Sequence, residues 1–233
     1  MKHIFRTILG CLVITSFAFS QQTERERKIK TLNELRSQIA SLEAYVLSPD
    51  PEDSSLAASK GFKAFRLLPR EKYDGVLTVR GGGAYYSFSK ENHNYDSGTD
   101  ISLERERLTV GFAGADYGFL QQLGELDLSD LSADLPSIEF LVKYQPPKDE
   151  PSIRMEQERS NNYTAGEIVF SRSVPAIVGE NYALRSIRFG KSDVLVLFNI
   201  YRRDSDGNLI IFWKHIHTFD VPEMRRGTTV SVR

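Results

Sequence analysis

The sequence predicts a mainly β fold, an antiparallel β-sandwich or a partly closed barrel, preceded by an amphipathic helix. From about residue 61 onward, short segments rich in β-branched and aromatic residues alternate with turn residues. No long helical pattern separates these segments, which favours antiparallel strands over β-α-β units. Between residues 23 and 47, by contrast, apolar residues recur at spacings of three and four. We therefore expect a removable leader over residues 1–20, a helical segment over 21–60 and a β domain over 61–233.

The composition excludes several classes of protein. The 233 residues include 30 basic and 31 acidic side chains, so the formal net charge is -1. That balance leaves no positive excess to attract nucleic acid, and we expect no nucleic-acid partner. The single cysteine, Cys11, cannot form an intramolecular disulfide or a multi-cysteine zinc site.

The first twenty residues have the pattern of a secretory signal peptide. Lys2 and Arg6 give a positive start, residues 8–19 are apolar, and small residues precede a cleavage position between Ser20 and Gln21. This run is shorter than the roughly twenty residues that a membrane-spanning helix needs. We therefore expect a secreted or periplasmic chain without a transmembrane anchor. Without Lys2 and Arg6, that mature chain would carry 28 basic and 31 acidic groups, a net charge of 28 - 31 = -3.

The segment before Cys11 loosely resembles a bacterial lipobox. A lipobox ends the hydrophobic segment of a leader, whereas most of the apolar residues here follow the cysteine. We therefore do not expect a lipoprotein anchored through Cys11.

The segment 23–47 has the pattern of one helix with an apolar stripe. The stripe consists of Leu32, Leu35, Ile39, Leu42 and Val46. Two interpretations stay open: the stripe pairs two copies of the chain through residues 29–47 as a short coiled coil, or the helix lies on its own domain. Pro49 ends the helix, and Asp50 followed by Pro51 predicts a brief second helix that stops near Gly61.

Nine segments have the pattern of strands. They are residues 76–80, 84–89, 101–104, 107–112, 138–144, 167–172, 182–189, 194–202 and 209–219. Residues 194–200 are almost continuously apolar, as in a central strand covered on both faces, and residues 204–208 join them to the last strand as a hairpin. The apolar positions change from odd to even numbers between Leu103 and Leu108, which predicts a bulge or a strand break.

Two stretches do not fit the strand pattern. Residues 114–137 carry regularly spaced leucines among acidic side chains, which indicates a packed excursion with a helical turn. Residues 146–151 include three prolines and indicate a stiff, exposed connector.

We expect the glycine-rich turn and the 114–137 excursion to form the ligand-binding edge of the domain. The candidate ligand-binding residues there are Gly81, Gly82, Gly83, Asp116, Tyr117 and Phe119. The three glycines precede a strand rather than a helix, so they lack the helix N-terminus of a phosphate-binding loop. Aromatic rings on loops suit sugars and protein partners alike, and packing in the core is the alternative role for each ring.

His215 and His217 are the candidates for a metal site. Because side chains alternate along a strand, both imidazoles are expected on one face, together with Trp213 and Phe219. A catalytic zinc site needs a third ligand, and His93 is the only other histidine outside the leader. An aspartate or glutamate would otherwise have to serve. The alternative interpretation is that both are surface or interface histidines on a terminal strand.

Two further motifs point to chemistry. Asp96-Ser97-Gly98-Thr99 has the residue types of the aspartic-protease loop, in which two carboxylates share a proton, but one copy would require a symmetric dimer. Asp204, Asp206 and Asn208 imitate the first ligands of a calcium loop. The later glycine and bidentate acid of an EF-hand are missing, so a hairpin turn explains these residues better.

These observations favour a non-catalytic binding or structural module of the cell envelope or exterior. Its partner would be a protein or a glycan at the cell surface, and no cofactor is predicted. The alternative function is a secreted hydrolase, either metal-assisted through His215 and His217 or of the aspartic type through Asp96.

Overall fold

The structure is a computed structural model that describes residues 2–95 and 98–225, with side chains described from residue 22 onward. The chain divides into two compact units, one that ends at Val46 and one that begins at Leu47.

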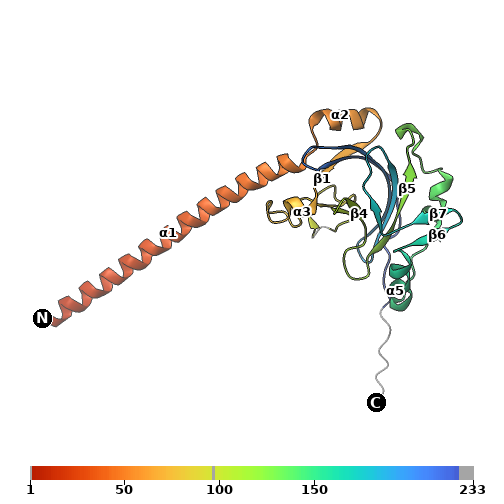
Figure 1. Cartoon of the computed structure of the whole chain (residues 1–233). Helices are drawn as coiled ribbons and strands as arrows, with labels where there is room; N and C mark the ends of the chain where they lie inside the picture. The colour runs from red at the N-terminus through yellow and green to blue at the C-terminus, as the bar shows by residue number, and fades with distance from the viewer. Residues whose placement is uncertain (1, 96–97, 226–233) are drawn as a thin grey trace, which may run out of the picture. The chain divides into compact units, whose positions relative to one another are not determined.

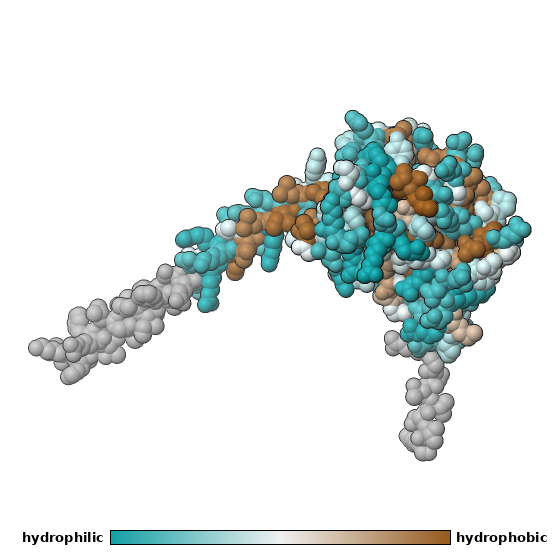
Figure 2. Space-filling model, viewed as in Figure 1, coloured by the Kyte–Doolittle hydropathy of each residue, from teal (hydrophilic) through white to brown (hydrophobic). Residues whose placement is uncertain are grey.

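The first unit consists of a single helix. α1 (Lys2–Leu47) includes the whole segment 23–47, so the expected N-terminal helix is confirmed. Its apolar stripe is exposed, with Leu32 at 50%, Leu35 at 48% and Ile39 at 41% of their full accessible surface, and Figure 2 shows apolar residues along this part of the helix. Across the described part of the chain, no helix combines the length and the apolar character needed to cross a bilayer.

The second unit is built on a five-stranded antiparallel sheet (Figure 1). Its strands, in spatial order, are β1 (Lys63–Leu67), β11 (Leu209–Thr218), β10 (Ser192–Arg203), β9 (Asn181–Arg188) and β5 (Tyr117–Gly124). The first nine residues of β10 are buried, which confirms the predicted central strand. The expected hairpin to β11 is also confirmed, because the amide of Asp204 donates to the carbonyl of Asn208 at 2.9 Å across the turn.

A second sheet covers one face of the first. It contains β2 (Tyr85–Tyr86), β3 (Ile101–Glu104), β4 (Arg107–Thr109) and β8 (Ser173–Pro175). Side chains from both sheets, among them Phe65, Leu108 and Trp213, form one buried cluster between them. The sheets do not close into a barrel, so the sandwich is the correct form of the prediction.

Short helices and a β-hairpin cover the opposite face of the five-stranded sheet. These are α2 (Pro51–Ser59), η2 (Leu128–Asp130), η3 (Pro136–Ile138), α4 (Glu139–Lys143), α5 (Glu150–Arg159) and the hairpin of β6 (Tyr163–Ala165) and β7 (Ile168–Phe170); α3 (Arg70–Tyr73) lies between β1 and β2 in the chain. They contribute Ala57, Leu141 and Ile153 to a second buried cluster. Because both faces of the sheet are covered, its central strand is apolar at nearly every position.

Two of the predicted strands are not strands. Residues 76–80 form turns and bends, and residues 138–144 lie in the end of η3 and in α4. Pro136 begins the turn of η3, and the following apolar run continues as a helix that buries Leu141. A short apolar run does not by itself distinguish a buried strand from a buried helix.

Strand β5 and helix α5 were not predicted. β5 occupies much of the 114–137 excursion, where the helical turn that we expected is η2. The connector predicted over 146–151 ends inside α5, where the carboxylate of Asp149 caps the helix by accepting from the amide of Ser152 at 3.0 Å. A strand break, as predicted, lies between Leu103 and Leu108, because β3 and β4 form a hairpin that turns at two residues with positive φ.

Candidate functional site

Two cavities flank the end of the β9–β10 hairpin. Arg185 and Arg188 lie three residues apart on β9, so their side chains point to opposite faces of the five-stranded sheet. On the helix-covered face, Arg185 lines a wide cleft of about 580 Å³. On the other face, Arg188 lines a small pocket of about 150 Å³, called here the Arg188 pocket.

The floor of the wide cleft is a buried ion pair. Arg185 and Asp193 side chains are each 1% exposed, and Nε and Nη2 of the arginine donate to the two carboxylate oxygens at 2.9 and 2.8 Å. Arg185 Nη1 also donates to the carbonyls of Leu141 and Tyr144 at 2.6 and 2.7 Å. Burial raises the pKa of Asp193, and the hydrogen bonds and charge of Arg185 oppose that rise. Both carboxylate oxygens are therefore already used by a structural pair.

The two candidate metal-binding histidines do not share a face, contrary to the simple alternation expected from the sequence. His217 pairs with Leu195 and His215 with Val196, so Ile216 is an extra residue in β11, as in a β-bulge. Leu195 packs in the helix-covered cluster and Val196 in the cluster between the sheets. The register thus places His217 at the wide cleft, where it contacts the ring of Phe219, and His215 toward the opposite face.

The described residues contain no group of three histidine, cysteine, aspartate or glutamate side chains that could hold a metal ion. His93, the third histidine considered, packs edge-on against Tyr86, and its Nε2 lies 2.6 Å from the carbonyl of Arg66. Burial lowers the pKa of His93, and burial is also the largest cause of the lowered pKa of His215.

Most of the predicted ligand-binding residues are buried. Gly81, Gly82 and Gly83 form a buried turn with positive φ, and a Cβ at Gly81 would lie 2.2 Å from the ring of Tyr85. Tyr117 and Phe119 are 1% and 0% exposed and pack in the helix-covered core. The glycines therefore allow close packing, and the two rings stabilise the core.

Asp116, by contrast, lines the Arg188 pocket. The other residues of that lining are Tyr95, Gly98, Thr99, Phe112, Ala113, Arg188 and Lys191. Gly98 and Thr99 come from the motif that resembled an aspartic-protease loop, whereas Asp96 itself lies outside the described residues. Arg188 could not be identified as a site residue from the sequence, because nothing in the neighbouring sequence of β9 indicates that residues 98, 99 and 116 line the same pocket.

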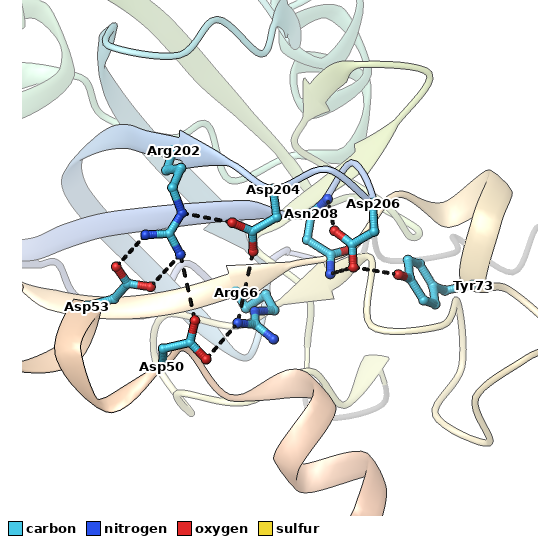
Figure 3. Close-up of polar contacts among 8 residues, drawn as sticks. All are labelled: Asp50, Asp53, Arg66, Tyr73, Arg202, Asp204, Asp206 and Asn208. Carbon is cyan, nitrogen blue, oxygen red and sulfur yellow. Dashed lines mark hydrogen bonds and ion pairs between the residues drawn. The ribbon is translucent and has the colours of Figure 1, made fainter.

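The acidic hairpin turn that resembled a calcium loop is part of an ion-pair network (Figure 3). Arg202 binds both carboxylate oxygens of Asp53 at 2.8 Å and one oxygen of Asp204 at 2.8 Å. The carboxylate of Asp206 accepts from the hydroxyl of Tyr73 at 2.9 Å and from the side-chain amide of Asn208 at 2.7 Å. These contacts attach α2 and α3 to the β10–β11 hairpin, so the turn has a structural role.

No protein-family model, curated protein or solved structure matches this chain.

Proposed function

We propose that the protein is an exported, non-catalytic binding or structural module of the cell envelope or exterior. The leader-like pattern of residues 1–20 supports export. N-terminal sequencing of the protein recovered outside the cytoplasm should give a chain that begins at Gln21. Recovery of an uncleaved chain from the cytoplasm would contradict this part of the proposal.

The wide cleft is the observation that carries the binding function. Its volume of about 580 Å³ falls in the range of ligand-binding clefts. Its floor is rigid, because Arg185 is held by Asp193 and by two backbone carbonyls. A carboxylate held by arginine through both oxygens is a poor partner for a catalytic histidine, so this arrangement favours recognition over hydrolysis.

The walls of the cleft favour a peptide segment of a protein partner. Lys148 and Arg225 supply positive charge, and Asp220 and Glu223 supply negative charge. Phe219, Val221 and Pro222 add apolar surface between these charges. Mixed charge beside apolar surface complements a peptide, whereas a neutral glycan would leave the charges unpaired.

The test compares the binding of peptides and of neutral glycans to the full chain and to variants of the cleft. We expect peptides from a random displayed library to bind the full chain more tightly than the members of a neutral glycan array. The exposed substitutions Lys148→Glu and Glu223→Lys should each weaken binding about tenfold or change the preferred peptide charge, because each reverses one side of the cleft. Lys90→Glu and Glu167→Lys, which are exposed and outside the cleft lining, are the matched controls.

Three outcomes would contradict the proposal. Peptides that bind equally well to the cleft variants would exclude the cleft as the site. Preferential binding of neutral glycans would refute the peptide partner. Cleavage of bound peptides by the purified chain, abolished by His217→Ala, would favour the hydrolase instead.

We also propose that residues 29–47 pair two copies of the chain. Ile39 and Val46 alternate with Leu35 and Leu42 at the spacing of a two-stranded parallel coiled coil, with β-branched residues and leucine in the two preferred positions.

A further inference from the structure

The Arg188 pocket contains a buried guanidinium whose hydrogen-bond donors are not all satisfied by the residues that the structure describes. Arg188 is 3% exposed, and its guanidinium has one hydrogen bond to the described residues, from Nη1 to the hydroxyl of Ser192 at 3.4 Å. Its Nε is buried without a hydrogen-bond partner in the described part of the chain. A buried donor on a charged group that lacks an acceptor is costly, and such groups are few in folded proteins.

The neighbouring acids do not satisfy this nitrogen. Asp116 Oδ2 lies 3.7 Å from Nε, which is beyond hydrogen-bond distance. Asp100 is fully buried and accepts instead from the hydroxyl of Ser186 and the amide of Phe88, both at 2.8 Å. Arg188 therefore interacts with both carboxylates through charge, and neither carboxylate accepts a hydrogen bond from Nε.

A second unused donor faces the same cavity. The hydroxyl of Thr99 is buried and has no partner among the described residues. Beside it, Gly98 has φ +100°, and a Cβ there would lie 1.7 Å from Nη2 of Arg188. The backbone at Gly98 thus packs directly against the guanidinium, and only glycine leaves room for that contact.

The charges and the size of the pocket indicate which group would bind. Arg188 and the exposed Lys191 bring two positive charges, and the carboxylate of Asp116 opposes a strongly negative ligand. Tyr95 and Phe112 add aromatic surface to a cavity of about 150 Å³. A single carboxylate on a small carbon frame meets these conditions better than a dianion such as sulfate.

We propose that the Arg188 pocket binds a carboxylate group of a ligand, which accepts hydrogen bonds from Nε of Arg188 and from the hydroxyl of Thr99. Lys191 at the rim contributes attraction. The carboxylate could belong to the C-terminus of a peptide or to a sugar acid, which share this chemistry. The proposal does not depend on the wide cleft, which lies on the opposite face of β9.

The test follows the unpartnered nitrogen itself. The Nε–Hε signal of Arg188 is followed in the ¹⁵N spectrum of the full chain and is assigned by its loss in Arg188→Lys. The protein is titrated with N-acetylglycine and, separately, with glucuronate. We expect a saturable shift with at least one of them, and the one that binds more tightly identifies a peptide terminus or a sugar acid as the source. N-acetylglycinamide and glucose, which lack the carboxylate, should cause no shift.

Variants then test the assigned donors. Thr99→Val keeps the shape of the side chain and removes the hydroxyl, so affinity should fall about tenfold. Lys191→Ala removes an exposed charge and should weaken binding about threefold. Lys90→Ala is the matched surface control and should bind like the unmodified chain. Because Lys191 is exposed, its variant remains informative if Thr99→Val does not fold.

Several results would overturn the proposal. One is the absence of a shift with both acids, and another is equal binding of sulfate, which would make the pocket a general anion site. Unchanged affinity in both variants would show that the side chains of Thr99 and Lys191 do not contact the bound carboxylate. None of these outcomes bears on peptide binding in the wide cleft.

Discussion

At the scale of single residues, the buried pair of Arg185 and Asp193 shows how burial makes a charge dependent on its partner. Each charge loses its hydration on burial, and only the partner and the bound carbonyls compensate for that loss. Breaking the pair is therefore costly, even though the pair as a whole adds little net stability.

We predict that Asp193→Ala lowers the free energy of unfolding by about 3–5 kcal/mol, because it leaves a buried guanidinium without its counter-charge. The double variant Arg185→Met, Asp193→Leu should recover part of that loss, but not all, since two carbonyls lose their donor. Urea denaturation of the three proteins measures both effects. A double variant as unstable as Asp193→Ala would show that the pair itself provides the stability.

The buried His93 predicts a pH dependence of stability. Burial lowers the pKa of His93 in the folded chain below the value of about 6.5 for an exposed histidine. Below that pH the unfolded chain takes up a proton that the folded chain resists, so the free energy of unfolding falls as the pH decreases through the window between the two pKa values. The slope from one such group is at most about 1.4 kcal/mol per pH unit.

We expect His93→Gln to remove this component. Its amide nitrogen can still donate to the carbonyl of Arg66, but it does not titrate. Urea denaturation at about pH 7.5 and about pH 5.5 should show a smaller acid-induced loss in the variant than in the unmodified chain. An identical loss would mean that other groups, such as His215, cause the dependence.

At the scale of elements, the sequence predicted the start of a helix where neighbouring residues determine it, but not a strand whose burial depends on a distant partner. Asp50 before Pro51 predicted α2 correctly, although the carboxylate of Asp50 makes no cap hydrogen bond there. An aspartate followed by an early proline also precedes α5, where the side chain of Asp149 does cap the helix. At that position the three prolines of residues 146–151 indicated an exposed connector instead of a helix start. Strand β5 was missed for a different reason: its polar Gln121 is buried by pairing with β9, which the local pattern does not reveal.

The ion pair of Arg202 and Asp53 predicts how strongly α2 is attached to the sheet. Asp53 is 5% exposed and receives two hydrogen bonds from Arg202, whereas Arg202 itself is 40% exposed and partly screened by water. We expect Asp53→Ala to lower the free energy of unfolding by about 1–2 kcal/mol, which is more than an exposed pair contributes. Glu52→Ala, on an exposed neighbouring position, is the control and should change stability by less than about 0.5 kcal/mol in the same denaturation experiment. Equal losses in the two variants would contradict the special role of this pair.

At the scale of the whole molecule, the sequence predicted the sandwich better than the candidate site. A strand is predicted from several neighbouring residues at once, as in the apolar run 194–200, so the prediction does not depend on any single position. The Arg188 pocket depends instead on residues 98, 99, 116 and 188, which meet only after the sheets pack. Among the predicted residues, Asp116 lines this pocket because it lies just before β5. The next residue, Tyr117, is the first residue of that strand and is buried in the core.

The last prediction concerns whether two copies of the chain form a dimer through α1. If the stripe of α1 pairs two chains, a chain that begins at Gln21 should have the mass of a dimer in sedimentation equilibrium. That dimer should dissociate on dilution, because only about two heptads are available. Leu35→Asp with Leu42→Asp places charge in the apolar seam and should give a monomer. Ser37→Asp with Ser41→Asp, on exposed positions outside the stripe, adds the same charge and should leave the dimer intact. A monomeric mature chain whose β domain is destabilised by the first pair of substitutions would instead favour a helix that lies on its own domain.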